Sequence, residues 1–109
     1  MALSVSTSEG NGHVVVSVEG EVDVSNAAEL RSALDAALEG NVSTVEADLS
    51  QVSYIDSTGI GVLVGFAHRA ADLGIGYGVA NPQRNVRRVL SLLGVESELN
   101  VHADENPSS

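Results

Sequence analysis

An acid and two hydroxyl residues stand together near the middle of the chain. Asp56, Ser57 and Thr58 follow Ile55 and precede a glycine-rich apolar run, in the stretch YIDSTGIGVLVGF, residues 54–66. Three kinds of chemistry suit such a cluster. A small polar residue can cap a helix, a serine can be a catalytic nucleophile, and an exposed hydroxyl can accept a phosphoryl group from another enzyme.

A catalytic role for Ser57 requires a base within hydrogen-bond reach and a group that orients that base. The histidines are His13, His68 and His102, and the expected elements place none of them beside Ser57. The sequence around Ser57 also departs from the G-x-S-x-G pattern of serine hydrolases. We therefore expect no enzymatic activity.

Motifs for bound ligands are missing as well. The chain has no G-x-x-x-x-G-K-[ST] loop, and neither G-I-G-V-L-V nor G-I-G-Y-G-V has the G-x-G-x-x-G spacing of a dinucleotide site. Asp23, Asp48 and Asp56 are conceivable metal ligands, but their spacing fits no known ligand set, and the chain has no cysteine. We therefore expect neither a metal nor a cofactor.

Composition narrows the class of protein further. The 109 residues, 43% of them hydrophobic, suffice for one domain with a core. A net charge of -10 disfavours binding to nucleic acid or to anionic membranes. The chain has no signal-peptide pattern at its start and no apolar run long enough to span a bilayer, so we expect a cytoplasmic protein.

Four stretches alternate apolar with polar or glycine residues, which is typical of strands with one buried face: residues 3–6, 13–19, 44–49 and 74–79. The turn-rich EGNG, residues 9–12, predicts that the first two strands form an antiparallel hairpin. Helical patterns separate the later strands, as parallel crossovers require. Strands buried on both faces would be continuously apolar, so we expect the helices mainly on one face of the sheet.

Three helices are expected, over residues 26–40, 57–73 and 81–94. For the first, Asn26 and Glu29 suggest a capping box; for the third, Asn81 suggests a cap followed by Pro82. The apolar stripes expected on the first two helices comprise Ala27, Leu30, Leu34, Ala37 and Leu38, then Ile60, Leu63, Val64, Ala67 and Ala71.

The resulting fold class is a small α/β domain over residues 1–102, with a mixed sheet of four or five strands, the last being a short strand within residues 99–102. A flexible polar tail is expected over residues 103–109.

The start of the second helix carries two further signals. Asp56 or Ser57 is expected to cap it, although capping alone does not need three polar residues in succession. Gly59 and Gly61 each weaken a helix by about 0.8–1 kcal/mol relative to alanine. Because glycine lets another backbone or a ligand approach closely, these glycines suggest a contact surface.

Three segments together resemble the STAS domain of bacterial anti-sigma factor antagonists. They are G-E-V-D-V-S-N-A-A-E-L, D-S-T-G-I-G-V-L-V and V-A-N-P-Q-R-N-V-R-R-V-L-S-L-L-G-V, in this order, and the resemblance extends over about residues 3–101. Members of that family bind an anti-sigma factor that is also a serine kinase and so free a sigma factor. Phosphorylation by that kinase inactivates them, and a serine/threonine phosphatase of the metal-dependent class resets them.

The resemblance implies roles for particular residues of this chain. Ser57 is the expected phosphoacceptor, with Thr58 as a second hydroxyl that could take the phosphate instead. Asp23, Asp56, Ser57, Thr58 and Gly59 are the expected partner-binding residues. Related STAS domains also serve in stress-sensing and lipid-transport assemblies, so the alternative is an accessory subunit of a larger complex that is not switched by phosphorylation.

Overall fold

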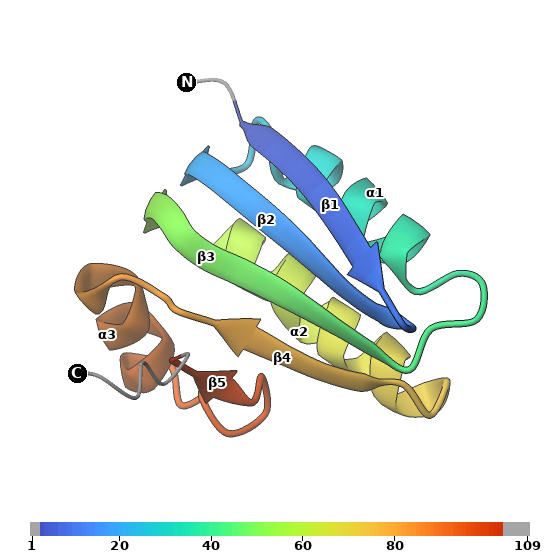
Figure 1. The fold of residues 1–109 in the computed structure, drawn as a ribbon. Coiled ribbons are helices and arrows are strands. Elements are labelled where there is room, and N and C mark those ends of the chain that lie inside the picture. The colour runs from blue at the N-terminus through green and yellow to red at the C-terminus, as the bar shows by residue number, and fades with distance from the viewer. Residues whose placement is uncertain (1–2, 104–109) are drawn as a thin grey trace, which may run out of the picture.

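The computed structural model describes residues 3–103, which form a mixed five-stranded sheet and three helices (Figure 1). The elements are β1 (Ser4–Gly10), β2 (His13–Val22), α1 (Ala27–Ala37), β3 (Thr44–Ile55), α2 (Ser57–Asp72), β4 (Gly76–Ala80), α3 (Arg84–Leu92) and β5 (Val101–His102). The strands lie in sequence order across the sheet; β1 is antiparallel to β2, and the other neighbours are parallel. The expected α/β fold class is confirmed. Of the expected polar tail, residues 104–109 lie outside the described residues.

The expected hairpin between β1 and β2 is confirmed. Gly10 pairs with His13, and the two residues between them, Asn11 and Gly12, have φ angles of 55° and 82°. Positive φ at both central positions is what a two-residue type I′ turn requires, and Asn-Gly is a preferred sequence for it. The turn therefore fixes the register in which β1 pairs with β2.

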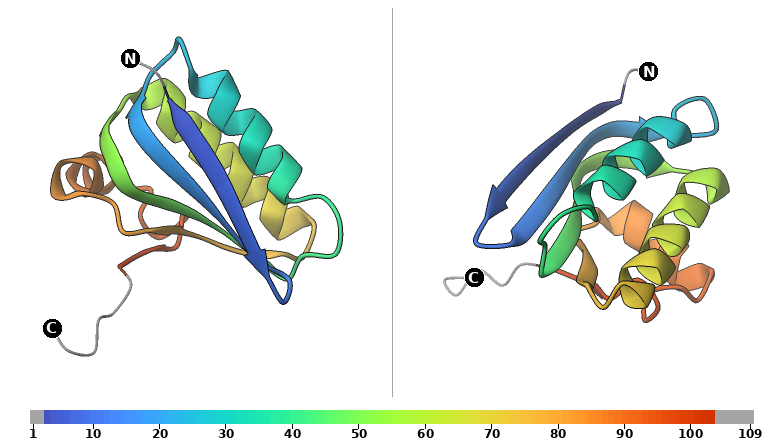
Figure 2. Two further views of the ribbon diagram at one scale, coloured as in Figure 1. Left: turned by 45° about the horizontal axis from the view of Figure 1, so that its top comes forward. Right: turned by 90° about the vertical axis from the view of Figure 1, so that its right-hand side faces the viewer.

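The helices α1 and α2 cover one face of the sheet and leave the other open (Figure 2). On β2, Val14, Val16 and Val18 are buried, whereas Ser17 and Glu19 are exposed. The third helix, α3, lies beside the second half of β3, beyond the end of β4. There the side-chain amide of Gln83 donates to the carbonyl oxygen of Ser50 at 3.0 Å. The side-chain amide of Asn85 donates to the carbonyl oxygen of Ser53 at 2.7 Å.

The core lies between the covered face of the sheet and the helices, and it contains the expected stripe of α1 in full. On α2 the expected stripe is partly wrong. Ala71 is exposed, and Phe66 and Ala70 are buried instead. At about 3.6 residues per turn, Leu63, Ala67 and Ala70 lie near the middle of the buried face, whereas Ala71 lies at its edge in the last turn of the helix.

The capping box expected at Asn26 is wrong. Asn26 precedes α1, but its side chain makes no bond to the amides of the helix. Instead its Oδ1 accepts from the amide of Asp23 at 2.9 Å, and its Nδ2 donates to the carbonyl oxygen of Glu21 at 2.8 Å. The buried Asn26 side chain thus braces the turn that leaves β2.

The third helix begins later than expected, at Arg84, so Asn81 is not its cap and Pro82 is not its first residue. Asn81 has a φ of 57°, and its amide donates to the carbonyl oxygen of His102 at 2.8 Å. These residues belong to the connection that holds β5 against β4.

The strand β3 is longer than expected and ends at Ile55 rather than at Leu49. Its buried residues in the second half are Leu49, Val52 and Ile55, which are three positions apart instead of two. The pairing with β2 is irregular there, with register shifts after Ser17 and after Gly20. Such an irregularity interrupts the alternation of buried and exposed residues from which the strand was predicted. Because β3 continues to Ile55, Asp56 directly follows the sheet.

Candidate functional site

Asp56 joins the end of β3 to the first turn of α2. Its backbone is extended, with φ -98° and ψ -178°, and its Oδ1 accepts from the amide of Gly59 at 3.0 Å. Its own amide donates to the carbonyl oxygen of Val22 on β2 at 3.1 Å. Of the two capping residues expected, Asp56 is therefore the one observed, and such a cap stabilises a helix by about 0.5–2 kcal/mol.

Ser57 and Thr58 are the first two residues of α2, and both are exposed. Among residues 3–103, neither side chain takes part in a hydrogen bond. Both hydroxyls lie at a helix N-terminus, where the unpaired amides and the helix dipole favour negative charge. An anion attached at this position would be tolerated by the fold.

Gly59 packs against the sheet and is buried. A Cβ atom at this position would lie 2.6 Å from Cγ1 of Val22 and 2.7 Å from Cγ1 of Ile55. The close approach that the glycine permits is therefore to the chain's own strands. Gly61 differs, because a Cβ atom there would meet nothing within 4 Å.

Asp23 follows Val22 at the same end of the sheet as Asp56. Its Oδ1 accepts from the hydroxyl of Ser25 at 2.5 Å and from the amide of Ser25 at 2.9 Å. These bonds, with the hydroxyl contributing most, hold the pKa of the Asp23 carboxyl below its ordinary value of 3.8. Since the carbonyl oxygen of Val22 accepts from the amide of Asp56, Asp23 and Asp56 lie on adjacent connections at this end of the sheet.

Two apolar residues beside this cluster were not singled out from the sequence. Val24, next to Asp23, is 75% exposed, and Tyr54, two residues before Asp56, is 50% exposed. Exposed apolar and aromatic side chains around a polar centre are typical of surfaces that bind another protein. Tyr54 stands in an irregular part of β3, so simple alternation could not show that it faces outward.

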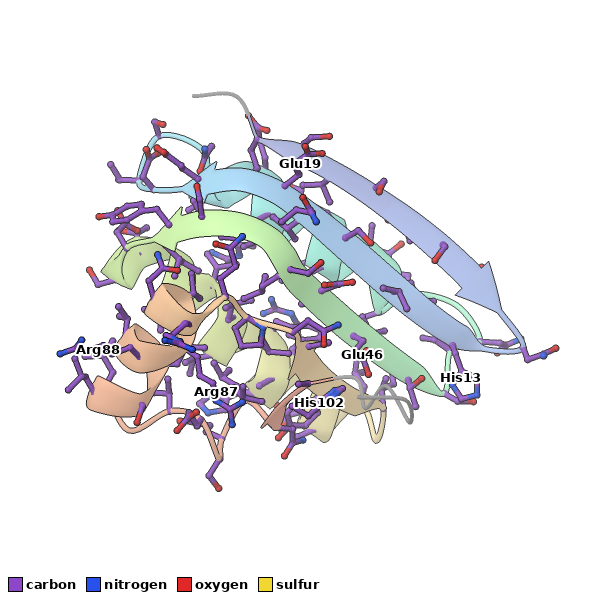
Figure 3. The ribbon with its side chains drawn as sticks, turned by 60° about the vertical axis from the view of Figure 1, so that its left-hand side comes forward. His13, Glu19, Glu46, Arg87, Arg88 and His102 are labelled. Atoms are coloured by element: carbon purple, nitrogen blue, oxygen red, sulfur yellow. The ribbon has the colours of Figure 1, made fainter. Side chains whose placement is uncertain are left out.

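The three histidines lie away from Ser57 and have other partners. Nδ1 of His13 is 2.6 Å from the Thr44 hydroxyl, His68 bonds to Glu98, and Nε2 of His102 is 3.1 Å from Glu46. Figure 3 shows His13, Glu46 and His102 along the open side of the sheet. A base for a Ser57 nucleophile is thus missing among the described histidines.

The three aspartates considered as metal ligands do not converge. Asp48 lies within β3, where its Oδ1 accepts from the amide of Ser50 at 2.9 Å, whereas Asp23 and Asp56 lie beyond the strand ends. Within residues 3–103, no three side chains of His, Cys, Asp or Glu are placed to hold a metal ion. In the same part of the chain, no helix has the length and apolar character needed to cross a bilayer.

This chain and its fold resemble known proteins. The anti-sigma-F factor antagonist RsfB of Mycobacterium tuberculosis is 27% identical over 95 residues, which cover 87% of this chain and 77% of that protein. The anti-sigma-B factor antagonist of Bacillus subtilis is 28% identical over 103 residues, or 94% of either protein. The crystal structure of an anti-sigma factor antagonist from Mycobacterium paratuberculosis, 26% identical, matches with a TM-score of 0.85 over 93% of this chain and 86% of that one.

The STAS domain family itself matches residues 4–106, nearly the whole chain. The match includes all three segments from which the resemblance was drawn. This chain therefore belongs to the STAS domain family.

Proposed function

We propose that this protein is an anti-sigma factor antagonist that is switched off by phosphorylation of Ser57. It binds an anti-sigma factor that is also a serine kinase, and this binding frees a sigma factor. The observation that carries the proposal is the exposed hydroxyl of Ser57 at the start of α2, which has no hydrogen-bond partner among residues 3–103 and directly follows the capping Asp56. The similar proteins of Mycobacterium tuberculosis and Bacillus subtilis are anti-sigma factor antagonists, which supports the same role.

The site suits a substrate of a kinase better than a catalyst. Its one serine nucleophile lacks a base among the described histidines, and the hydroxyl is reachable from solvent. A phosphoserine adds a charge of about -1.5 to -2 beside Asp56, in a chain whose net charge is already -10. The helix N-terminus offsets this charge within the protein by about 0.3–1 kcal/mol, whereas a partner that packs against the phosphate must strip it of water.

The surface that meets the kinase comprises groups at this end of the sheet. Val24, Tyr54, Ser57 and Thr58 are exposed, and Asp23 and Asp56 are partly buried. Gly59 supports this surface indirectly, because its lack of a side chain lets the first turn of α2 pack closely against β2 and β3. A serine/threonine phosphatase of the metal-dependent class would remove the phosphate and restore binding. Control of sigma factors places this exchange of partners in the bacterial cytoplasm.

The test uses the purified full chain and the kinase-type anti-sigma factors encoded in its source genome. At least one of them is expected to bind the chain and, with ATP, to add one phosphate that mass spectrometry locates at Ser57. The Thr58→Val variant removes the neighbouring hydroxyl and keeps Ser57. It should still receive its phosphate at Ser57, and the readout is the position of the phosphate rather than the rate, because Thr58 belongs to the partner surface. Absence of binding to every such anti-sigma factor would contradict the proposal and favour an accessory subunit that is not switched.

A further inference from the structure

A groove runs between α1 and α2, on the side of these helices that faces away from the sheet. Its volume is about 250 Å³. The residues that line it are Arg31, Thr58, Gly61, Val62, Gly65 and Arg69. Thr58 stands next to Ser57, so the groove is continuous with the surface already assigned to the partner.

The floor of this groove is kept free of side chains at Gly61 and Gly65. A Cβ atom at either position would meet nothing within 4 Å, whereas at Gly59 it would collide with Val22 and Ile55. Internal packing therefore accounts for Gly59 and does not account for the other two. Because glycine weakens a helix interior, two unexplained glycines in one helix indicate that something outside the chain occupies the space above them.

The groove is also positively charged, which is unusual on this protein. Arg31 and Arg69 contribute two of the five basic residues of a chain with a net charge of -10. They share a single acid, Asp35, with Nη2 of Arg69 at 2.5 Å and Nε of Arg31 at 3.9 Å from its carboxylate oxygens. Within the described residues, Nε of Arg69 is buried and has no hydrogen-bond partner.

We propose that an acidic segment of the anti-sigma factor lies in this groove, with a carboxylate bound by Arg31 and Arg69 and its backbone against Gly61 and Gly65. Two arginines that share one carboxylate leave an excess of positive charge in the groove, which favours an anionic group, and a planar guanidinium suits a carboxylate. The inference rests on the proposed function, because it names where the same partner makes its second contact. In this arrangement the groove selects the partner, and phosphorylation of Ser57 controls whether the partner binds.

The experiment measures the affinity of the anti-sigma factor that binds the wild-type chain, by calorimetric titration at low and at high salt. The Arg31→Gln and Arg69→Gln variants are each expected to bind several-fold more weakly, and the double variant about tenfold or more. The loss should shrink at high salt, because screening weakens charge pairs at a protein surface. The variants should still be phosphorylated at Ser57 when the kinase is in excess.

The matched control removes two arginines from a different surface. Arg84 and Arg88 are exposed on α3, carry no ion pair among the described residues and do not line the groove between α1 and α2; Figure 3 shows Arg88 pointing away from the body of the protein. The double variant Arg84→Gln with Arg88→Gln changes the net charge by the same amount and should bind like the wild type. An equal loss in this control would mean that overall charge, and not the groove, matters, and would overturn the inference.

A second variant tests the space above the glycines. Gly61→Leu should fold, since its side chain enters open space, and it should reduce affinity about tenfold by filling the groove. If the wild type binds normally and both Gly61→Leu and the double variant Arg31→Gln with Arg69→Gln bind with unchanged affinity, the groove contact is overturned. The proposed function then remains intact. Failure of the wild type to bind any anti-sigma factor would instead overturn both.

Discussion

Ser57 and Thr58 are neighbouring exposed hydroxyls, and their positions differ in one respect that matters for a kinase. Ser57 directly follows the capping Asp56, whereas Thr58 lines the groove between α1 and α2. We expect Ser57→Ala to abolish phosphorylation and to keep the fold and the binding. Its effect on the free energy of unfolding should stay within about 0.5 kcal/mol, because the hydroxyl makes no bond that the fold uses.

Mass spectrometry after incubation with kinase and ATP checks this expectation, and a pull-down checks the binding. Phosphate retained in Ser57→Ala and lost in Thr58→Val would move the acceptor to Thr58.

The two nearby glycines should respond in opposite ways to alanine. Gly59→Ala places a methyl group 2.6 Å from Val22 and 2.7 Å from Ile55, and such overpacking costs about 1–3 kcal/mol of stability. Gly61→Ala enters open space and should raise stability by about 0.4–1 kcal/mol, since alanine restricts the unfolded chain and favours helix. Urea denaturation of the two variants measures the difference. Equal effects of the same sign would contradict the packing at Gly59.

The carboxyl of Asp23 depends on Ser25 for its low pKa. We expect Ser25→Ala to raise this pKa toward 3.8, because the hydroxyl bond is the largest of the causes that lower it. A carboxyl whose pKa is lower in the folded state stabilises the protein above its unfolded value, and this stabilisation disappears as the pH falls through the folded value. Ser25→Ala should therefore be less stable than the wild type at neutral pH, and the difference should shrink as the pH falls below 3.8. An NMR titration of Asp23 tests the pKa, and urea denaturation at neutral and at low pH tests the stability.

At the scale of the elements, the cap on α2 is what fixes the position of Ser57. Asp56→Ala removes the bond to the amide of Gly59 and should destabilise the protein by about 0.5–2 kcal/mol. Asp56→Asn is the matched variant, because asparagine caps about as well and lacks the charge. Thermal unfolding should rank Asp56→Asn near the wild type and Asp56→Ala below it; a low melting temperature for both would mean that charge, and not capping, is what Asp56 supplies.

The elements themselves follow largely from local patterns in the sequence. The alternation on β2, the Asn-Gly turn and the stripe of α1 predicted the strands, the hairpin and the covered face that the structure contains. Those signals are local, because each depends only on which residues a single element buries.

The parts that could not be predicted depend on contacts between elements. The second half of β3 loses its alternation where its register with β2 shifts, so the sequence pattern did not predict that the strand extends to Ile55. Asn26 bonds to Asp23 and Glu21 instead of capping α1, and Asn81 bonds to His102 instead of starting α3. The packing reason for Gly59, and the exposure of Val24 and Tyr54, likewise require knowledge of what lies across from each residue.

At the scale of the whole molecule, the proposed switch is a matter of charge on a rigid scaffold. The chain carries a net charge of -10, and Asp23 and Asp56 lie at the end of the sheet where the phosphate would be added. The helix N-terminus tolerates the added anion, so the backbone should keep its arrangement. A partner surface packed against the phosphate must give up water and face like charge, which costs several kcal/mol.

The most direct measurement is a calorimetric titration of the anti-sigma factor with the unmodified and the Ser57-phosphorylated protein, accompanied by circular dichroism of both forms. Phosphorylation is expected to weaken binding about a hundredfold or more, since each 1.4 kcal/mol corresponds to about a factor of ten. The two dichroism spectra are expected to coincide. Equal affinities, or a phosphorylated form that has unfolded, would contradict an electrostatic switch at Ser57.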